Sequence, residues 1–152
     1  MKKLNTLLFS ISLCLCFSFI TTDSVFLGTQ TDGLNVGEKA PGFTIESPDG
    51  KEFSLNDYKG KVVLLDFWAS WCGPCQMMAP IFKDAAAHMP FDARFAKVNT
   101  EHAQGVSGQY GIRSIPTLIV FHQGKEIDRL AGALPAAQLQ QWIRQALLKA
   151  KQ

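Results

Sequence analysis

Apolar residues form one long continuous run near the middle of the chain and shorter runs on either side of it. The long run covers residues 62–68, is rich in β-branched and aromatic side chains, and is interrupted only by Asp66. Such a run predicts a central strand that is covered on both faces. Three further strands are predicted at 94–99, 117–121 and 126–131. A β-hairpin is predicted over 43–47 and 52–55, because the turn sequence Pro-Asp-Gly-Lys connects these two segments.

Helical spacing predicts two longer helices. After Cys75, apolar side chains recur every three or four residues as far as Met89, Pro74 suits the first turn, and Pro80 is expected to kink the helix. The last helix opens at Pro135 and places these apolar residues on one face: Leu139, Trp142, Ile143, Ala146 and Leu147. A short helical turn or a loop is expected at 56–60, and a short helix at 101–110. The alternation predicts an α/β fold, with a central mixed β-sheet flanked by helices and an N-terminal β-hairpin.

The first 24 residues differ from the rest of the chain. Lys2 and Lys3 precede an uncharged, largely apolar stretch at 7–20, which is the pattern of a secretory signal peptide. Residues 4–20 are only just long enough to cross a bilayer, so a retained membrane anchor is the alternative. Both interpretations predict an exported protein, in the periplasm or on the outer side of a membrane. Residues 25–35 are interpreted as a linker, and 36–152 as one folded domain.

Composition narrows the functional classes. The chain has 152 residues, 47% of them hydrophobic and 18% charged, with a formal net charge of +2. This is enough apolar material for one domain core, and it excludes disorder over most of the length. A nucleic-acid binder would show clustered Lys and Arg, and no long run of one sign occurs. Small molecules or other proteins are therefore the expected partners, and no nucleic acid.

Outside the first 24 residues the chain contains only two cysteines, Cys72 and Cys75, too few for a stabilising disulfide framework. At the junction of a strand and a helix, two cysteines at this spacing can form and break a small disulfide ring. The helix N-terminus would stabilise a Cys72 thiolate, and Cys75, less exposed, would resolve a mixed disulfide. A structural disulfide and half of a zinc site are the alternatives, but zinc would need two more ligands and only scattered histidines are available: His88, His102 and His122. We assign these histidines no role and predict no metal.

The segment 71–75, Trp-Cys-Gly-Pro-Cys, follows Asp-Phe-Trp-Ala at 66–69 and resembles the active site of thioredoxin. The match continues through 97–99, 110–118, Gly124 and 132–134 in the order and spacing of that family, and covers roughly 62–148. The resemblance implies the thioredoxin fold and a thiol-disulfide oxidoreductase that needs no bound cofactor. It also implies a monomer whose substrates are disulfide-containing proteins.

The resemblance implies roles for further residues. Pro116, after Ile115, corresponds to a cis-proline that lies against the disulfide; by itself it would be a proline at the start of a strand. Asp66 corresponds to a buried proton acceptor beneath Cys75, and Lys97 to its partner; a structural acid and a solvated lysine are the alternatives. The substrate-binding surface would contain Trp71, Gly73, Pro74, Ile115, Gly132 and Ala133, each of which could equally serve packing.

The N-terminal portion, at 36–43, 49–51 and 54–61, resembles exported thiol reductases of the TlpA and ResA type. Those proteins often serve cytochrome c maturation, and they carry an extra helix and strand after the active-site helix. Too few positions separate Cys75 from Lys97 to hold that insertion. The resemblance predicts a reductase that receives electrons from a membrane thiol-transfer protein. A reductase for cytochrome c maturation is the alternative function, and a non-catalytic binding module is a further one.

Overall fold

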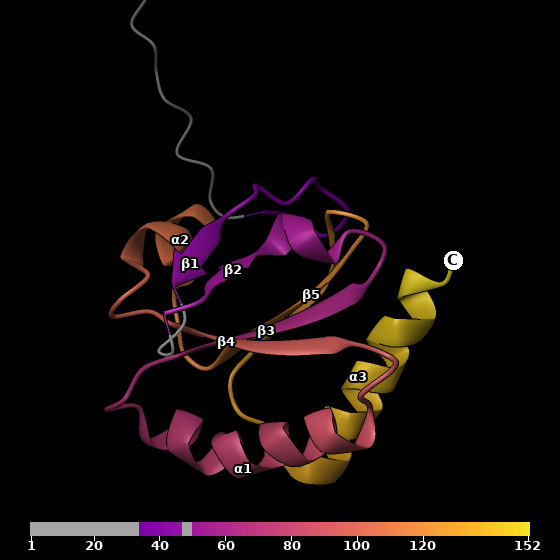
Figure 1. Cartoon of the computed structure of the whole chain (residues 1–152). Coiled ribbons are helices and arrows are strands. Elements are labelled where there is room, and N and C mark those ends of the chain that lie inside the picture. The colour runs from indigo at the N-terminus through magenta and orange to yellow at the C-terminus, as the bar shows by residue number, and fades with distance from the viewer. Residues whose placement is uncertain (1–33, 47–49) are drawn as a thin grey trace, which may run out of the picture.

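The computed structural model describes residues 34–46 and 50–152 (Figure 1). The predicted signal peptide or anchor at 1–24 lies outside the described residues. The same holds for most of the predicted linker and for the tip of the predicted hairpin turn at 47–49. These three predictions therefore stay predictions. The sheet, the helices and the two hairpin strands fall within the described ranges.

A four-stranded mixed sheet forms the centre of the domain, in the order β4-β3-β5-β6. β3 (Val62–Trp68) pairs in parallel with β4 (Arg94–Asn99) and antiparallel with β5 (Thr117–His122). β6 (Lys125–Ala131) pairs antiparallel with β5 and forms one edge. The middle five residues of β3 are buried, as predicted for a strand that is covered on both faces.

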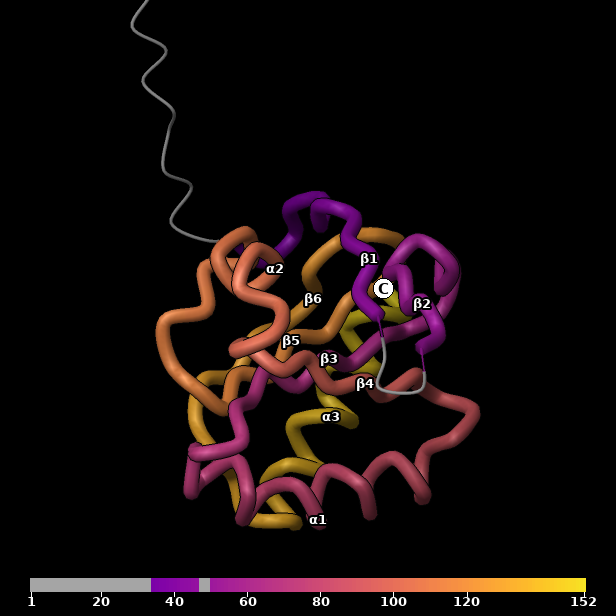
Figure 2. The backbone as a smooth tube through the Cα atoms, turned by 60° about the vertical axis from the view of Figure 1, so that its left-hand side comes forward, coloured from indigo at the N-terminus to yellow at the C-terminus, as the bar shows by residue number. Residues whose placement is uncertain are grey.

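The two longer helices cover one face of this sheet, and a short helix together with the N-terminal elements covers much of the other. α1 (Gly73–His88) and α3 (Ala136–Ala150) lie together below the sheet in Figures 1 and 2. Above it lie α2 (Gln104–Gln109), the antiparallel pair β1 (Thr44–Glu46) and β2 (Glu52–Ser54), and the 3₁₀ helix η1 (Leu55–Tyr58). α1 continues through Pro80 as one helix. The predicted hairpin strands and mixed sheet are confirmed.

The predicted helix at 101–110 is too long, and Asn99 explains why. Its side-chain oxygen accepts a hydrogen bond from the Glu101 N–H at 2.9 Å, and its backbone carbonyl accepts from His102 and Ala103 at 3.2 and 2.9 Å. These bonds hold residues 100–103 in a turn, so α2 starts only at Gln104. A side chain that competes for backbone groups delays helix entry in this way.

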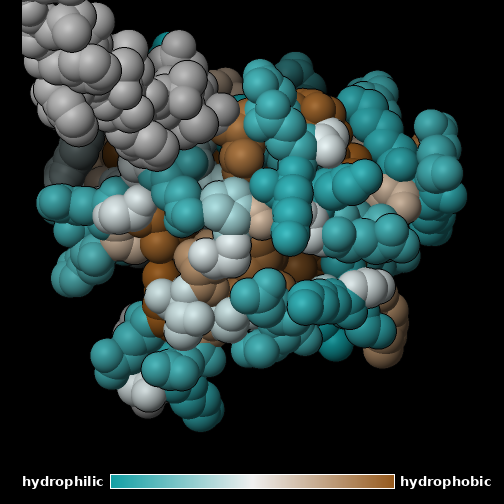
Figure 3. Space-filling model, turned by 90° about the horizontal axis from the view of Figure 1, so that it is seen from above, coloured by the Kyte–Doolittle hydropathy of each residue, from teal (hydrophilic) through white to brown (hydrophobic). Residues whose placement is uncertain are grey.

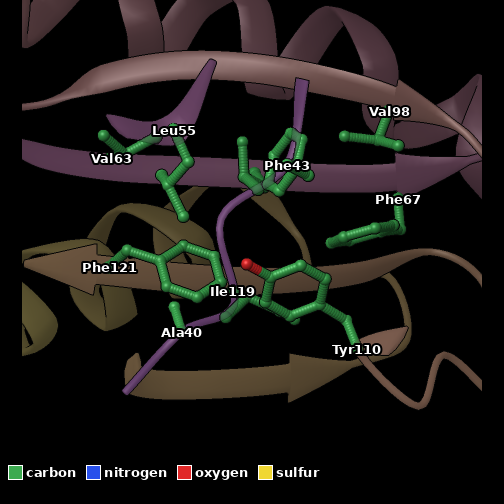
Figure 4. Packing of buried hydrophobic residues seen from close by; sticks show 10 residues of the cluster. Ala40, Phe43, Leu55, Val63, Phe67, Val98, Tyr110, Ile119 and Phe121 are labelled. Carbon is green, nitrogen blue, oxygen red and sulfur yellow. The ribbon is translucent and has the colours of Figure 1, made fainter. Parts of the chain in front are cut away.

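Two apolar clusters lie on the two faces of the sheet. The cluster between the sheet and the helices α1 and α3 contains Leu64, Met78, Phe82, Leu118, Leu139 and Ile143. The opposite cluster, shown in Figure 4, contains Phe43, Leu55, Val63, Phe67, Tyr110 and Phe121. Successive residues of a strand point to opposite faces. Asp66 therefore shares the α1 side of β3 with Leu64.

A short N-terminal segment runs along β6 and extends the sheet. The Gly37 and Ala40 N–H groups donate to the carbonyls of Glu126 and Gly124, each at 2.7 Å, and Lys39 forms an isolated antiparallel bridge with Lys125. Tyr110 completes this attachment, because its hydroxyl donates to the Pro41 carbonyl at 2.6 Å. Figure 3 looks from above onto the side of the sheet that carries α2, β1 and β2, where polar side chains surround apolar atoms. The predicted domain limits, 36–152, stay a prediction.

Candidate active site

The two cysteines lie at the N-terminus of α1, just after the loop that follows β3. Cys72 is the N-cap residue of α1, and its Sγ accepts a hydrogen bond from the Cys75 N–H at 3.2 Å. The two residues form a disulfide with their Cα atoms 5.2 Å apart. The exposed fractions, 4% for Cys72 and 2% for Cys75, are too similar to distinguish their roles. Position distinguishes them instead, because the free N–H groups of a helix N-terminus stabilise a thiolate at Cys72.

The loop before β5 faces the disulfide. The Cys72 Sγ lies 3.7 Å from the Ile115 carbonyl oxygen, and the Ile115 side chain packs against the small cluster of Ala69 and the two cysteines. The peptide bond between Ile115 and Pro116 is cis, as the resemblance implied, and Pro116 is buried. The Pro116 carbonyl accepts from the Gly132 N–H at 2.8 Å. Gly132 has a φ of 99°, which favours glycine at this position.

The predicted substrate-binding residues fall into two groups. Trp71 is 71% exposed, and Gly73 and Pro74 are exposed in the first turn of α1 next to the disulfide. Ile115 and Gly132 are half-buried, and Ala133 is exposed just beyond Gly132. Of these six residues, Ile115 packs directly on the cluster that contains the cysteines. Gly132 is linked to the site through Pro116.

Asp66 and Lys97 are direct neighbours across the parallel pair of β3 and β4. Asp66 is 1% exposed, and its Oδ2 accepts a hydrogen bond from Lys97 Nζ, which also lies 5.0 Å from the centroid of the Trp68 ring. Oδ1 is buried and has no hydrogen-bond partner among the described residues. Burial raises the pKa of Asp66, and the Lys97 ammonium opposes this effect only in part.

Replacing Asp66 by Asn should stabilise the protein at neutral pH, because a buried carboxylate in this site is poorly compensated. Since the folded-state pKa lies above the unfolded value, the penalty is absent below about pH 4 and grows as pH rises through the folded pKa. We expect a gain on the order of 1 kcal/mol at pH 8 that vanishes toward pH 4, measured by chemical denaturation. The exposed Asp92→Asn variant serves as the control. A gain that is the same at both pH values would rule out burial of charge as its cause.

Glu101 is a site residue that the sequence analysis missed. Its carboxylate accepts from the Ser70 N–H at 3.1 Å and from the Ser70 hydroxyl at 2.8 Å, and the Trp71 side chain also donates to it. These bonds lower the pKa of Glu101 and fix the loop just before Cys72. The order of the strands could have identified Glu101 as a residue near the site. Glu101 follows β4, whose carboxyl end lies beside the carboxyl end of β3 in a parallel pair.

The histidines lie apart from one another. His88, in the last turn of α1, pairs with Asp84 at 3.4 Å, while His102 lies in the turn before α2 and His122 ends β5. Across residues 34–46 and 50–152, no group of three His, Cys, Asp or Glu side chains could hold a metal ion. In the same ranges, no helix is both long and apolar enough to span a bilayer.

Comparison with known proteins bears directly on this site. The thioredoxin family model matches residues 49–145, more than half of the chain. The chain belongs to the thioredoxin family. It is 49% identical to a thioredoxin of Chlorobaculum thiosulfatiphilum over 75 residues, which are 49% of this chain and 69% of that protein. It is 46% identical to thioredoxin 1 of a Nostoc species over 85 residues, 56% of this chain and 79% of that one.

Comparison with solved structures also finds a thioredoxin. The X-ray structure of thioredoxin from Fasciola hepatica superposes with a TM-score of 0.56 at 34% identity, covering 60% of this chain and 86% of that one. The predicted thioredoxin fold is thereby confirmed. Membership in this family and the Cys72–Cys75 disulfide make the protein a thiol-disulfide oxidoreductase. The similarity of its N-terminal portion to TlpA and ResA reductases stays a prediction.

Proposed function

We propose that this thioredoxin-family protein is an exported reductase of protein disulfides. The observation that carries the proposal is the position of Cys72: its Sγ sits at the N-terminus of α1, beside the Ile115 carbonyl, with exposed Trp71 and Pro74 around it. A thiolate at such a place can attack a disulfide that docks against a flat apolar surface. The Gly-Pro dipeptide between the cysteines and Ile115 before the cis-proline favour reduction, by resemblance to the family.

In the proposed reaction, the reduced protein transfers two electrons to its substrate. The Cys72 thiolate attacks one sulfur of the substrate disulfide, the substrate S–S bond breaks, and the departing thiolate takes a proton. A mixed disulfide now joins Cys72 to the substrate. The Cys75 thiol loses its proton, attacks the Cys72 Sγ, and displaces the second substrate sulfur. The substrate leaves with two thiols, and the Cys72–Cys75 disulfide remains.

Asp66 is proposed to receive the Cys75 proton, directly or through water. Burial raises the pKa of Asp66, and a raised pKa makes its carboxylate a better proton acceptor near neutral pH. Lys97 holds one carboxylate oxygen, and Oδ1, which has no hydrogen-bond partner in the described part of the chain, is left available to a proton. Lys97 is therefore proposed to tune and position Asp66.

The substrate surface, electron donor and location complete the proposal. Trp71, Gly73, Pro74, Ile115, Gly132 and Ala133 are proposed to receive the substrate backbone around Pro116. In an exported setting the oxidised pair must be reduced again, and a membrane thiol-transfer protein is the proposed donor. The protein itself is proposed to act as a monomer.

Cytochrome c maturation is the second candidate, and the confirmed β1–β2 pair favours it, because the hairpin lies in the portion that resembles TlpA and ResA. Against it, α1 ends at His88 and β4 begins at Arg94, so the extra helix and strand of those reductases are absent from this connection. Loss of haem attachment in a deletion strain, restored by added thiol, would support this candidate over general protein-disulfide reduction.

The reduction potential of the Cys72–Cys75 pair tests the proposed direction. The full chain, with Cys14 and Cys16 replaced by Ser, is equilibrated against defined thiol buffers, and alkylated cysteines are counted by mass. We expect a value near about −270 mV, that of a thioredoxin-like reductant. A value near about −120 mV would make the protein an oxidant, since about 30 mV is a tenfold change in the equilibrium.

A further inference from the structure

An open pocket of about 480 Å³ lies at the end of the sheet opposite the disulfide. The disulfide follows the carboxyl end of β3, whereas the pocket is lined by Lys61 and Val63 at the amino end of that strand. Its apolar floor includes Leu55 and Phe121, which lie with Val63 and Ala40 at one end of the cluster in Figure 4. Phe67 and Val98 lie at the other end. The pocket is therefore separate from the redox site.

The N-terminal segment supplies one wall of this pocket. Lys39 and Ala40 line it, and both precede the residues that match the thioredoxin family model, which begin at residue 49. The hydrogen bond from the Ala40 N–H to the Gly124 carbonyl fixes this wall against the β5–β6 turn. The thioredoxin core alone therefore does not form the complete pocket.

The rim of the pocket is strongly cationic. Lys39, Lys59, Lys61 and Lys125 all line it, and none of the carboxylates in the described ranges does. Among the residues that the structure describes, no ion pair neutralises any of these four lysines. The bridge between Lys39 and Lys125 also places two like charges opposite each other on adjacent strands. Such a placement is destabilising by itself.

Three carboxylates adjoin the lining residues along the chain, and none of them lines the pocket. Asp57, between the lining residues Asn56 and Tyr58, is exposed and forms no ion pair among the described residues. The other two are engaged elsewhere. Glu126 follows Lys125 but is buried and holds Arg129 through two contacts of 2.8 Å. Glu38 precedes Lys39, but its carboxylate accepts hydrogen bonds from the backbone and side chain of Asn35. The positive charge of the rim thus faces the pocket without a described counter-charge. A ligand with a negative group would supply it.

We propose that this pocket binds a small amphiphilic anion, a phosphate or carboxylate group attached to an apolar body. Its volume lies in the range of small-ligand sites, which is roughly 300–1,000 Å³. Lysine ammonium groups bind phosphate and carboxylate as point charges, and the half-buried Tyr58 ring, which packs on the cluster of Leu55, Val63 and Phe121, would contact a hydrocarbon or aromatic body. A lipid headgroup with its first methylenes and a soluble aryl or acyl phosphate share this chemistry. The inference does not depend on the redox function.

Binding of phenyl phosphate to the ¹⁵N-labelled full chain, followed by NMR, tests the proposal. We expect saturable shifts of the Gly60 and Gly124 amides, which line the pocket, and none at the Cys72 and Cys75 amides. Inorganic phosphate and phenol, each carrying only half of the recognised chemistry, should bind more weakly by roughly tenfold or more. A soluble short-chain phosphatidylglycerol is the second probe. If it binds more tightly than phenyl phosphate, a lipid headgroup is the better ligand, and if phenyl phosphate binds more tightly, a soluble compound is.

Charge-matched variants locate the site. The Lys59→Gln/Lys61→Gln double variant should weaken phenyl phosphate binding roughly tenfold at low salt. The Lys83→Gln/Lys151→Gln variant loses the same charge from exposed positions outside the pocket, and it should bind within about twofold of the parent protein. Equal weakening in both variants, shifts centred on the disulfide, or no saturable shift with either probe would overturn the proposal. Activity of the Cys72–Cys75 pair should be unchanged in both variants.

Discussion

Replacing Cys75 by Ser should convert the protein from a catalyst into a trap that remains covalently joined to its substrate. Cys72 can still attack a substrate disulfide, because its Sγ keeps the N-cap position on α1. The resulting mixed disulfide has lost its internal resolving thiol. Turnover of a disulfide-containing protein should therefore fall by about 10² or more. A one-to-one adduct, seen by mass and cleaved by dithiothreitol, should accumulate.

The matched control is Cys72→Ser in the same background, with Cys14 and Cys16 also replaced by Ser so that no other thiol reacts. This variant should give neither turnover nor adduct, because Cys75 lies within α1 and lacks the N-cap position. The opposite pattern, with the adduct in Cys72→Ser and normal turnover in Cys75→Ser, would reverse the assigned roles. Normal turnover in both variants would contradict a dithiol mechanism altogether.

Those parts of the fold that depend on local burial could be predicted closely. The sequence of β3 has no polar face, so both faces had to be covered, and its predicted limits agree with the structure. α3 carries an apolar stripe, and its inner residues Leu139, Ile143 and Ala146 are buried. Where a single side chain determines the start of a helix, the prediction from hydrophobic periodicity was wrong. Asn99 delays the entry into α2, and hydrophobic periodicity does not register such a hydrogen bond.

The site was predictable to the extent that neighbouring residues or the family resemblance specify it. The cysteine pair follows from its spacing and from the strand–helix junction, whereas the cis bond before Pro116 and the pairing of Asp66 with Lys97 came from resemblance. Glu101 was missed because its contact with Ser70 spans 31 positions in the chain. The pocket lined by Lys39, Lys59, Lys61 and Lys125 could not be predicted from the sequence either, because its lining comes from segments that only the folded sheet brings together.

Arg129 should be among the most costly single residues to remove outside the redox site. It extends from β6, holds the Glu126 carboxylate through Nε and Nη2, and donates from Nη1 to the Tyr110 carbonyl at 2.9 Å. Glu126 is 0% exposed, so an Arg129→Leu variant leaves a buried charge without its partner. We expect the free energy of unfolding to fall by about 3 kcal/mol, measured by chemical denaturation.

The two halves of this ion pair should not be equivalent, because the Arg129 side chain is 24% exposed and its guanidinium can turn toward water. Glu126→Leu should therefore cost less than Arg129→Leu, and the double variant should recover much of the loss, since it leaves no charge unpaired. Lys149→Leu is the control for an exposed pair, with Asp128, and should cost no more than about 1 kcal/mol. Equal losses in all the single variants would show that burial of Glu126 does not set the energy of this contact. If a large loss persists in the double variant, the lost stability comes instead from the hydrogen bond between Arg129 and the Tyr110 carbonyl. Because the Tyr110 hydroxyl also bonds the Pro41 carbonyl, that result would link the loss to the attachment of the N-terminal segment.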